Sequence, residues 1–308
     1  MLGPLLLRAS RNERARGIVT SAPAFRRVVR RFVPGEEAGD ILAATNDLVS
    51  AGLTVTIDHL GEDILDSAQA AATRDIYVQL LGQLAALGLA QHAEVSLKLS
   101  AMGQALPRDG QAVALGNARA VCQAAAAAGT TVTLDMEDHT TVDSTLSVLR
   151  DLRTDFPWVG AVVQSCLRRS EADLRDLVRP GSRVRLVKGA YAEPPSVAYA
   201  AKPDVDRAYV RCLEILMKGA GYPMVATHDA RLIEIAAHLA ERHGRGADGY
   251  EFQMLYGIRP TEQRRLAGSG SRVRVYVPYG GDWYGYFLRR LAERPANVLF
   301  LAKNFFRS

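Results

Sequence analysis

Residues 131–165 read TVTLDMEDHTTVDSTLSVLRDLRTDFPWVGAVVQS, and this stretch decides the fold class. It opens with a short β-rich run at 131–135, continues in a helical pattern at 142–156 and ends in a second β-rich run at 160–165. Two strands joined by a crossover helix form the repeating unit of a parallel sheet. The stretch therefore predicts a β-α-β unit, and the same alternation recurs on both sides of it.

Eight β-rich runs alternate with helical segments along the chain. Strands are predicted at 54–58, 95–99, 131–135, 160–165, 183–189, 224–228, 250–256 and 272–278. Helices are predicted at 67–87, 111–128, 142–156, 171–178, 205–219, 231–243, 261–267 and 284–293. Eight units in order favour a closed barrel over an open doubly wound sheet, since no G-x-G-x-x-G follows the first strand. The predicted fold is α/β, a (β/α)₈ TIM-type barrel.

The 308 residues are expected to form an amino-terminal helical arm and one barrel, because such a barrel needs about 250 residues. The arm spans 1–53, with a helix over 40–51, and the catalytic barrel spans 54–308, with its final helix over the barrel mouth. The first residues, MLGPLLLRASRNERARG, look like a targeting peptide in their arginine content. Their apolar run is too short for a secretory signal, which favours a helical arm.

Composition narrows the class of protein. The chain is 48% hydrophobic with a net charge of +5, which excludes a disordered protein. No helix-turn-helix, zinc spacing or aromatic-laced basic stripe is present, so nucleic-acid binding is not expected. An anionic ligand, an anionic membrane surface and an arginine-rich proteome all remain as explanations of the basic charge. Three separated cysteines and no apolar run of about 20 residues predict a cytoplasmic protein with reduced thiols and no metal site.

Polar residues gather where the active site of such a barrel lies, at the carboxyl ends of the strands. Each predicted strand carries at least one: Asp58, His59, Glu62, Lys98, Asp135, Glu137, Asp138, Gln164, Arg185, Lys188, Tyr191, Thr227, His228, Glu251, Gln253 and Tyr276. A single residue of this kind is commonly a helix cap or an ion-pair partner. Polar ends on all eight strands predict one convergent polar site.

Two basic clusters suggest anionic ligands. Arg185 and Lys188 are three residues apart, so both can serve one ligand only if the strand ends or twists near Gly189. They suit an anionic, polarisable group such as a reduced flavin. On the final helix Tyr286, Arg289, Arg290 and Glu293 share one side. The two arginines can grip a carboxylate, although a solvated amphipathic face is equally consistent with this segment.

Six segments resemble the signature segments of the proline dehydrogenase family. They are SLKLSA (96–101), TLDMED (133–138), RLVKGAY (185–191), ATHDA (226–230), EFQMLYG (251–257) and YFLRRLAERPAN (286–297). They follow the family's order across all eight strand positions, from about residue 26 to residue 300. The likeness is to the short, single-function bacterial members, which are related to the dehydrogenase domain of proline utilization A.

The resemblance implies FAD-dependent oxidation of L-proline to 1-pyrroline-5-carboxylate, the first step of proline catabolism. It implies electron transfer to a membrane quinone, peripheral contact with the inner face of the membrane, and pyrroline-5-carboxylate dehydrogenase as a partner. No catalytic side-chain base is implied. The matching substrate-binding residues are Lys98, Arg289 and Arg290 for the carboxylate, Glu293 as the partner of Arg289, and Asp135, Tyr191, Leu255, Tyr276 and Tyr286 as walls.

For FAD, the family's contacts match Gln164, Arg185, Val187, Lys188, Gly189, Ala190, Lys202, Thr227 and His228. Tyr276 resembles the tyrosine that distinguishes proline from hydroxyproline enzymes, which carry a smaller residue there. The chain departs from the family at Ala192, where an aromatic residue is common, and around Lys202, whose neighbours lack hydroxyl groups. Both departures concern the adenosine end of the cofactor.

Three other functions suit a barrel with these residues. A Schiff-base aldolase would use a strand lysine such as Lys188 or Lys98. A flavin barrel of the methylenetetrahydrofolate reductase type would share the cofactor but would reduce its substrate with a nicotinamide donor. A binding barrel without enzymatic activity is the third alternative.

Overall fold

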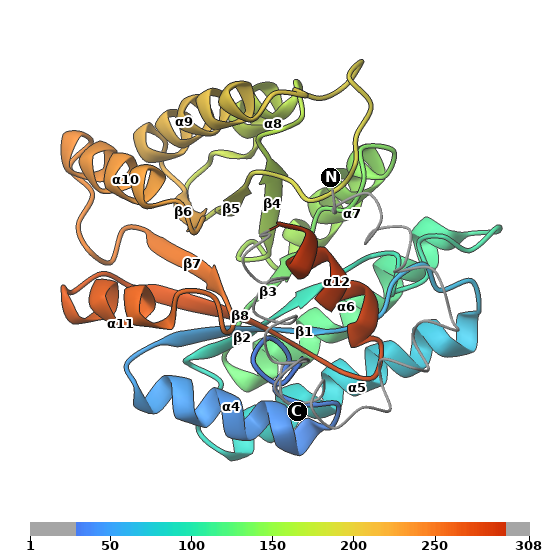
Figure 1. Cartoon of the computed structure of the whole chain (residues 1–308). Coiled ribbons are helices and arrows are strands. Elements are labelled where there is room, and N and C mark those ends of the chain that lie inside the picture. The colour runs from blue at the N-terminus through green and yellow to red at the C-terminus, as the bar shows by residue number, and fades with distance from the viewer. Residues whose placement is uncertain (1–28, 294–308) are drawn as a thin grey trace, which may run out of the picture.

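Eight strands close into one parallel barrel in the computed structural model, which describes residues 29–293 (Figure 1). Each strand pairs with the next along the chain, and β1 closes the barrel against β8 through Thr54 opposite Arg274 to His59 opposite Tyr279. The predicted (β/α)₈ fold is confirmed. The strands are β1 (Thr54–His59), β2 (Ala93–Leu97), β3 (Val132–Leu134), β4 (Gly160–Gln164), β5 (Arg183–Val187), β6 (Tyr222–Ala226), β7 (Glu251–Leu255) and β8 (Val273–Tyr279).

Helices surround the barrel (Figure 1). Side-chain caps begin two of them, because the carboxylates of Asp66 and Asp229 accept the backbone N–H groups of Gln69 and Arg231. The helices are α4 (Ala38–Ser50), α5 (Ser67–Ala86), α6 (Gly110–Ala128), α7 (Val142–Asp155), α8 (Ser170–Leu177), α9 (Lys202–Lys218), α10 (Ala230–Arg242), α11 (Pro260–Gly268) and α12 (Trp283–Glu293). None of those within residues 29–293 has the length and apolarity needed to cross a bilayer.

Several strands end earlier than the sequence predicts. Strands β2 and β6 each begin and end two residues before the predicted bounds, and β5 ends at Val187. Lys98, Lys188 and His228 therefore lie in the loops that follow the strands. Gly189 shows why β5 ends: its φ is +109°, and a Cβ there would lie 2.3 Å from Cys166 Sγ. Only glycine allows the chain to turn so close to the neighbouring loop.

Helix α9 starts earlier than predicted, at Lys202 instead of residue 205. Pro203 stands in its first turn, where proline favours helix initiation because its missing N–H would have no partner. The predicted start at residue 205 did not take Pro203 into account. As a result, Lys202 belongs to a helix terminus and not to a loop.

The last helix packs against the segment that precedes the barrel. Phe32 and Phe287 stack edge to face with ring centroids 5.9 Å apart, and Trp283 Nε1 donates to Glu36 Oε1 at 2.8 Å. The same segment crosses the rim of the barrel at Gly257, where a Cβ would lie 1.8 Å from the carbonyl oxygen of Arg31. These contacts hold α12 over the carboxyl ends of the strands, as predicted. Residues 1–28 of the predicted arm lie outside the described residues.

Candidate active site

One cavity of about 720 Å³ opens at the carboxyl ends of the strands. It is lined by every predicted site residue whose side chain is described: Lys98, Asp135, Gln164, Arg185, Val187, Lys188, Gly189, Ala190, Tyr191, Lys202, Thr227, His228, Leu255, Tyr276, Tyr286 and Arg290. The side chains of the predicted residues Arg289 and Glu293 lie outside the described part of the structure. Residues that span almost 200 positions in the sequence thus line one cavity.

An ion pair forms part of the floor of this cavity. Lys98 Nζ lies 2.7 Å from Asp58 Oδ2, and both side chains are nearly inaccessible to solvent. Burial alone would lower the pKa of Lys98, but the neighbouring Asp58, Glu62 and Asp135 carboxylates raise it above its ordinary value. Lys98 is therefore a fixed positive charge. A Schiff-base lysine needs the opposite shift, which argues against the aldolase alternative at this position.

Arg185, Asp135 and Tyr276 form a hydrogen-bonded group on one wall. Arg185 Nη1 donates to Asp135 Oδ1 at 2.6 Å, and the Tyr276 hydroxyl donates to Asp135 Oδ2 at 2.7 Å. The Arg185 guanidinium also lies 5.3 Å from the centre of the Tyr276 ring. Burial, followed by the Asp135 charge, raises the pKa of Tyr276 well above its usual value. The tyrosine stays protonated and its ring is fixed along the wall.

Two lysines meet two aspartates between β5 and β6. Lys188 Nζ lies 2.6 Å from Asp206 Oδ1 and 3.3 Å from Asp229 Oδ2. Lys202 Nζ lies 2.7 Å from Asp206 Oδ2. The Lys188 Nζ is consequently engaged by two carboxylates and is not presented as a free nucleophile, which argues against its use as a Schiff-base lysine. The amino termini of α9 and α10 begin beside this group, and helix amino termini favour anions.

Asp206 and Asp229 were not among the predicted site residues, although the sequence around each carries a signal. Asp206 lies four residues after Lys202, the spacing of neighbours on a helix. Asp229 lies two residues before the predicted helix over 231–243, near the position of an amino-terminal cap. Both signals are common in proteins and do not by themselves point to a site.

The hydrogen bonds of Gln164 and His228 show which of their polar atoms donate and which accept. Gln164 Nε2 donates to the carbonyl oxygens of Met136 and Glu137 at 3.1 and 2.9 Å, while its buried Oε1 has no hydrogen-bond partner within residues 29–293. The backbone N–H of Leu255 donates to His228 Nε2 at 2.9 Å. That contact places the proton of a neutral imidazole on Nδ1. Gln164 therefore offers a buried acceptor to the N–H group of a ligand.

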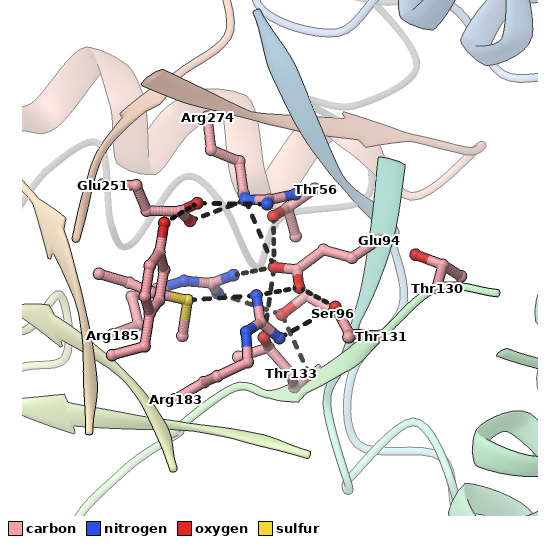
Figure 2. Close-up of polar contacts among 12 residues, drawn as sticks. Thr56, Glu94, Ser96, Thr130, Thr131, Thr133, Arg183, Arg185, Glu251 and Arg274 are labelled. Atoms are coloured by element: carbon pink, nitrogen blue, oxygen red, sulfur yellow. Dashed lines mark hydrogen bonds and ion pairs between the residues drawn. The ribbon is translucent and has the colours of Figure 1, made fainter. Parts of the chain in front are cut away.

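A second group of charged residues lies deeper in the barrel, toward the amino ends of the strands; we call it the lower network (Figure 2). Glu94 Oε2 lies 2.6 Å from Arg183 Nη2, and Glu251 Oε1 lies 2.7 Å from Arg274 Nε. The lower network consists of Glu94, Arg183, Glu251 and Arg274. Burial would raise the pKa of Glu94, but Arg183, Arg274 and Arg185 together hold it well below its usual range.

The lower network corrects one expectation. Glu251 was expected at the carboxyl end of its strand, but it is the first residue of β7 and lies at the opposite end. Glu94, Arg183 and Arg274 were not predicted as lumen residues. A period-two pattern could have revealed two of them, because Arg183 stands two residues before Arg185 and Arg274 two before Tyr276, on the same face of their strands.

Comparisons with known proteins show which family the chain matches. Residues 41–303 match the family model described as Proline dehydrogenase. The chain is 43% identical over 278 residues to "Proline dehydrogenase" of Deinococcus radiodurans, covering 90% of this chain and 89% of that protein. It is 39% identical over 274 residues to "Proline dehydrogenase 2" of Bacillus subtilis (strain 168), covering 89% and 88% respectively.

Among solved structures, the chain is similar to proline utilization A from Bdellovibrio bacteriovorus inactivated by N-propargylglycine. The TM-score is 0.80 with 26% sequence identity. The match covers 91% of this chain but 33% of that protein, so the chain spans about a third of its length.

Proposed function

Because this chain belongs to the proline dehydrogenase family, we propose that it oxidises L-proline to 1-pyrroline-5-carboxylate with FAD as its cofactor. The observation that carries the proposal is the single cavity lined by all described residues that resemble the family's proline and FAD contacts. Residues from six matched segments and from three positions outside them, Gln164, Lys202 and Tyr276, would not line one cavity by chance.

The residues of the cavity fit a flavin. Gln164 Oε1 is a buried acceptor without a hydrogen-bond partner in the described residues, which suits a ring N–H group. Gly189 and Ala190 also line the cavity, at the turn that the positive φ of Gly189 allows. Lys188 and Lys202, beside the amino termini of α9 and α10, would hold the phosphates. When bound, FAD supplies the acceptor for the hydride that proline loses.

Proline would be held by its carboxylate. Lys98 and Arg290, joined by Arg289, form the proposed cationic set, and Asp58 keeps Lys98 charged and in place. Tyr276, Leu255, Tyr191 and Tyr286 would enclose the ring. The substrate amine must be neutral when the hydride leaves, because its lone pair stabilises the developing cation. We propose that this proton goes to solvent, without an obligatory side-chain base.

We also propose that the electrons pass to a membrane quinone. A barrel must then visit the membrane surface, and the arginine-rich residues 1–53 would aid that contact by attraction to anionic lipids. Pyrroline-5-carboxylate dehydrogenase would take the product. Deletion of residues 1–20 should weaken binding to anionic liposomes and slow quinone reduction. If both stay unchanged, the arm has no such role.

A bleaching experiment tests the central proposal. The purified protein should be yellow and should lose its visible flavin absorbance when L-proline is added without oxygen. D-proline serves as the control and should leave the absorbance unchanged, because the carboxylate set fixes one face of the ring toward the cofactor. A protein that takes up no FAD, or that keeps its colour with L-proline, would contradict the proposal.

A further inference from the structure

A continuous series of hydrogen bonds joins the two ends of the barrel lumen. Glu251 Oε1 accepts from Gln253 Nε2 at 2.6 Å, and Gln253 Oε1 accepts from Arg185 Nε at 2.6 Å. Arg185 Nη1 donates to Asp135 Oδ1 at 2.6 Å, and the other oxygen of Asp135 accepts the Tyr276 hydroxyl at 2.7 Å. Gln253, which itself lines the cavity, thus links the lower network to Arg185.

The amide of Gln253 can take only one orientation. A guanidinium only donates hydrogen bonds and a carboxylate only accepts them, so the amide oxygen must face Arg185 and the amide nitrogen must face Glu251. Glu251 is itself held, because Arg274 contacts both of its oxygens, at 2.7 and 3.2 Å (Figure 2). Gln253 is therefore a spacer of fixed length and fixed polarity.

Arg185 depends on this spacer for the direction of its guanidinium. Its Nη1 donates to Ser96 Oγ at 3.1 Å as well as to Asp135. Its Nη2 lies 3.6 Å from Glu94 Oε1 and has no hydrogen bond within residues 29–293. The bond from Nε to Gln253 completes the set and fixes the plane of the rigid fork. Without the hydrogen bond to Gln253, the guanidinium can rotate about its Cδ–Nε bond, which would disturb its contact with Asp135.

We propose that Gln253 is a positioning residue, which couples the lower network to Arg185 and so orients the cation that faces the flavin. This inference rests on the proposed function, since it takes Arg185 as a flavin contact. A reduced flavin carries negative charge near its pyrimidine edge. A cation stabilises that charge most when its direction is set beforehand, because no reorganisation is then needed.

The test replaces Gln253 by methionine in the full-length holoenzyme. Gln253→Met keeps most of the volume but makes no hydrogen bond to Arg185 or Glu251. FAD should stay bound, and the equilibrium for flavin reduction should become about tenfold less favourable, a potential about 30 mV lower for this two-electron couple. The KM for L-proline should change less than tenfold, because the Lys98 ammonium is held by Asp58 and not by Gln253.

A second variant tests the polarity of the spacer and keeps the test decisive if the methionine variant does not fold. Gln253→Glu retains an acceptor for Arg185 but places a carboxylate against Glu251. One proton shared between the two carboxylates would restore the donor. The difference in flavin potential between Gln253→Glu and wild type should therefore shrink as the pH falls. A difference that does not vary with pH would contradict the assigned orientation of the amide.

A matched control separates positioning from packing. Asn117 is another buried amide, on α6, and its Nδ2 donates to the carbonyl oxygen of Met102 at 3.0 Å, outside the cavity. Asn117→Leu should lower the Tm and leave the flavin potential unchanged. If Gln253→Met does only the same, the inference is wrong. A wild-type protein that does not bleach with L-proline would instead contradict the proposed function, so the two failures are distinguishable.

Discussion

The two ends of the barrel lumen use the same kinds of side chain in different ways. In the lower network, each arginine lies within 3 Å of a glutamate oxygen, and Glu94 and Glu251 are almost fully buried. At the carboxyl end, Gln164 keeps a buried acceptor without a hydrogen-bond partner in the described residues, and the polar groups surround a cavity. Charges that are fully paired hold a structure, whereas groups left incompletely satisfied are available to a ligand.

The largest expected effect comes from breaking the lower network. Glu94→Gln removes the buried carboxylate that faces Arg183 and leaves that half-buried guanidinium without its charge partner. Loss of one partner of a buried ion pair costs about 3 kcal/mol or more. The free energy of unfolding, measured in urea, should fall by that amount. Glu171→Gln, which removes the partner of Arg211 at the surface, is the control and should cost less than about 1 kcal/mol.

The same variant should also change the pH dependence of stability. The pKa of Glu94 is depressed in the folded protein, so its stabilising contribution is present above the unfolded pKa and is lost as the pH falls toward the folded pKa. Wild-type stability should therefore decline below about pH 4.5, near the ordinary value for glutamate. Glu94→Gln should show a shallower decline in urea titrations across this range. Identical slopes would show that Glu94 is not ionised in the native state.

At the carboxyl end, Arg290→Met tests the binding of the substrate carboxylate. Loss of one guanidinium of the proposed set should raise the KM for L-proline about 50-fold, the range expected for a charged hydrogen bond. FAD content and urea stability should change little, because Arg290 belongs to the final helix and not to the lower network. A KM within twofold of wild type would refute the carboxylate assignment.

The pH dependence of activity should follow the substrate. Below the pKa of the proline amine, kcat/KM should rise about tenfold per pH unit, because only the neutral amine reacts. The pKa values of Lys98 and Tyr276 are both raised, so neither group should lose its proton before the amine does. Steady-state rates from pH 6 to pH 10 check this expectation. A bell-shaped profile, in which kcat/KM reaches its maximum before pH 9 and falls at higher pH, would indicate that a side chain loses an essential proton.

The smallest expected effect concerns a hydrogen bond within the wall of the cavity. Tyr276→Phe removes the hydroxyl that donates to Asp135 and keeps the ring. We expect kcat/KM for L-proline to fall about tenfold, the cost of one hydrogen bond to a charged carboxylate of about 1.5 kcal/mol. Tyr276→Ser should act mainly on specificity, raising the rate with hydroxyproline relative to proline. An unchanged ratio would remove Tyr276 from the determinants of specificity.

Much of the candidate site was predictable because its residues follow strands. Lys98, Lys188 and His228 lie in loops and not in strands as predicted, because their strands end earlier. They nevertheless lie at the predicted end of the barrel. Barrel closure brings all carboxyl ends together, so order along the chain suffices to place them. Which side chains form ion pairs with one another was not predictable in the same way. Asp58 was recognised as a polar strand end, yet its pairing with Lys98 depends on the register between β1 and β2.

The sequence by itself determined the (β/α)₈ order, the end of the barrel that carries the site, and membership of the family, since each depends on local pattern or on matched segments. Only the tertiary structure decided which charges neutralise one another. Glu94, Arg183 and Arg274 come from three separate strands, and they meet because the strands tilt and the register staggers as the barrel closes. That packing pairs the charges of the lower network, which borders a cavity of about 360 Å³. At the carboxyl end, beside the cavity of about 720 Å³, Gln164 keeps a buried acceptor without a hydrogen-bond partner in the described residues.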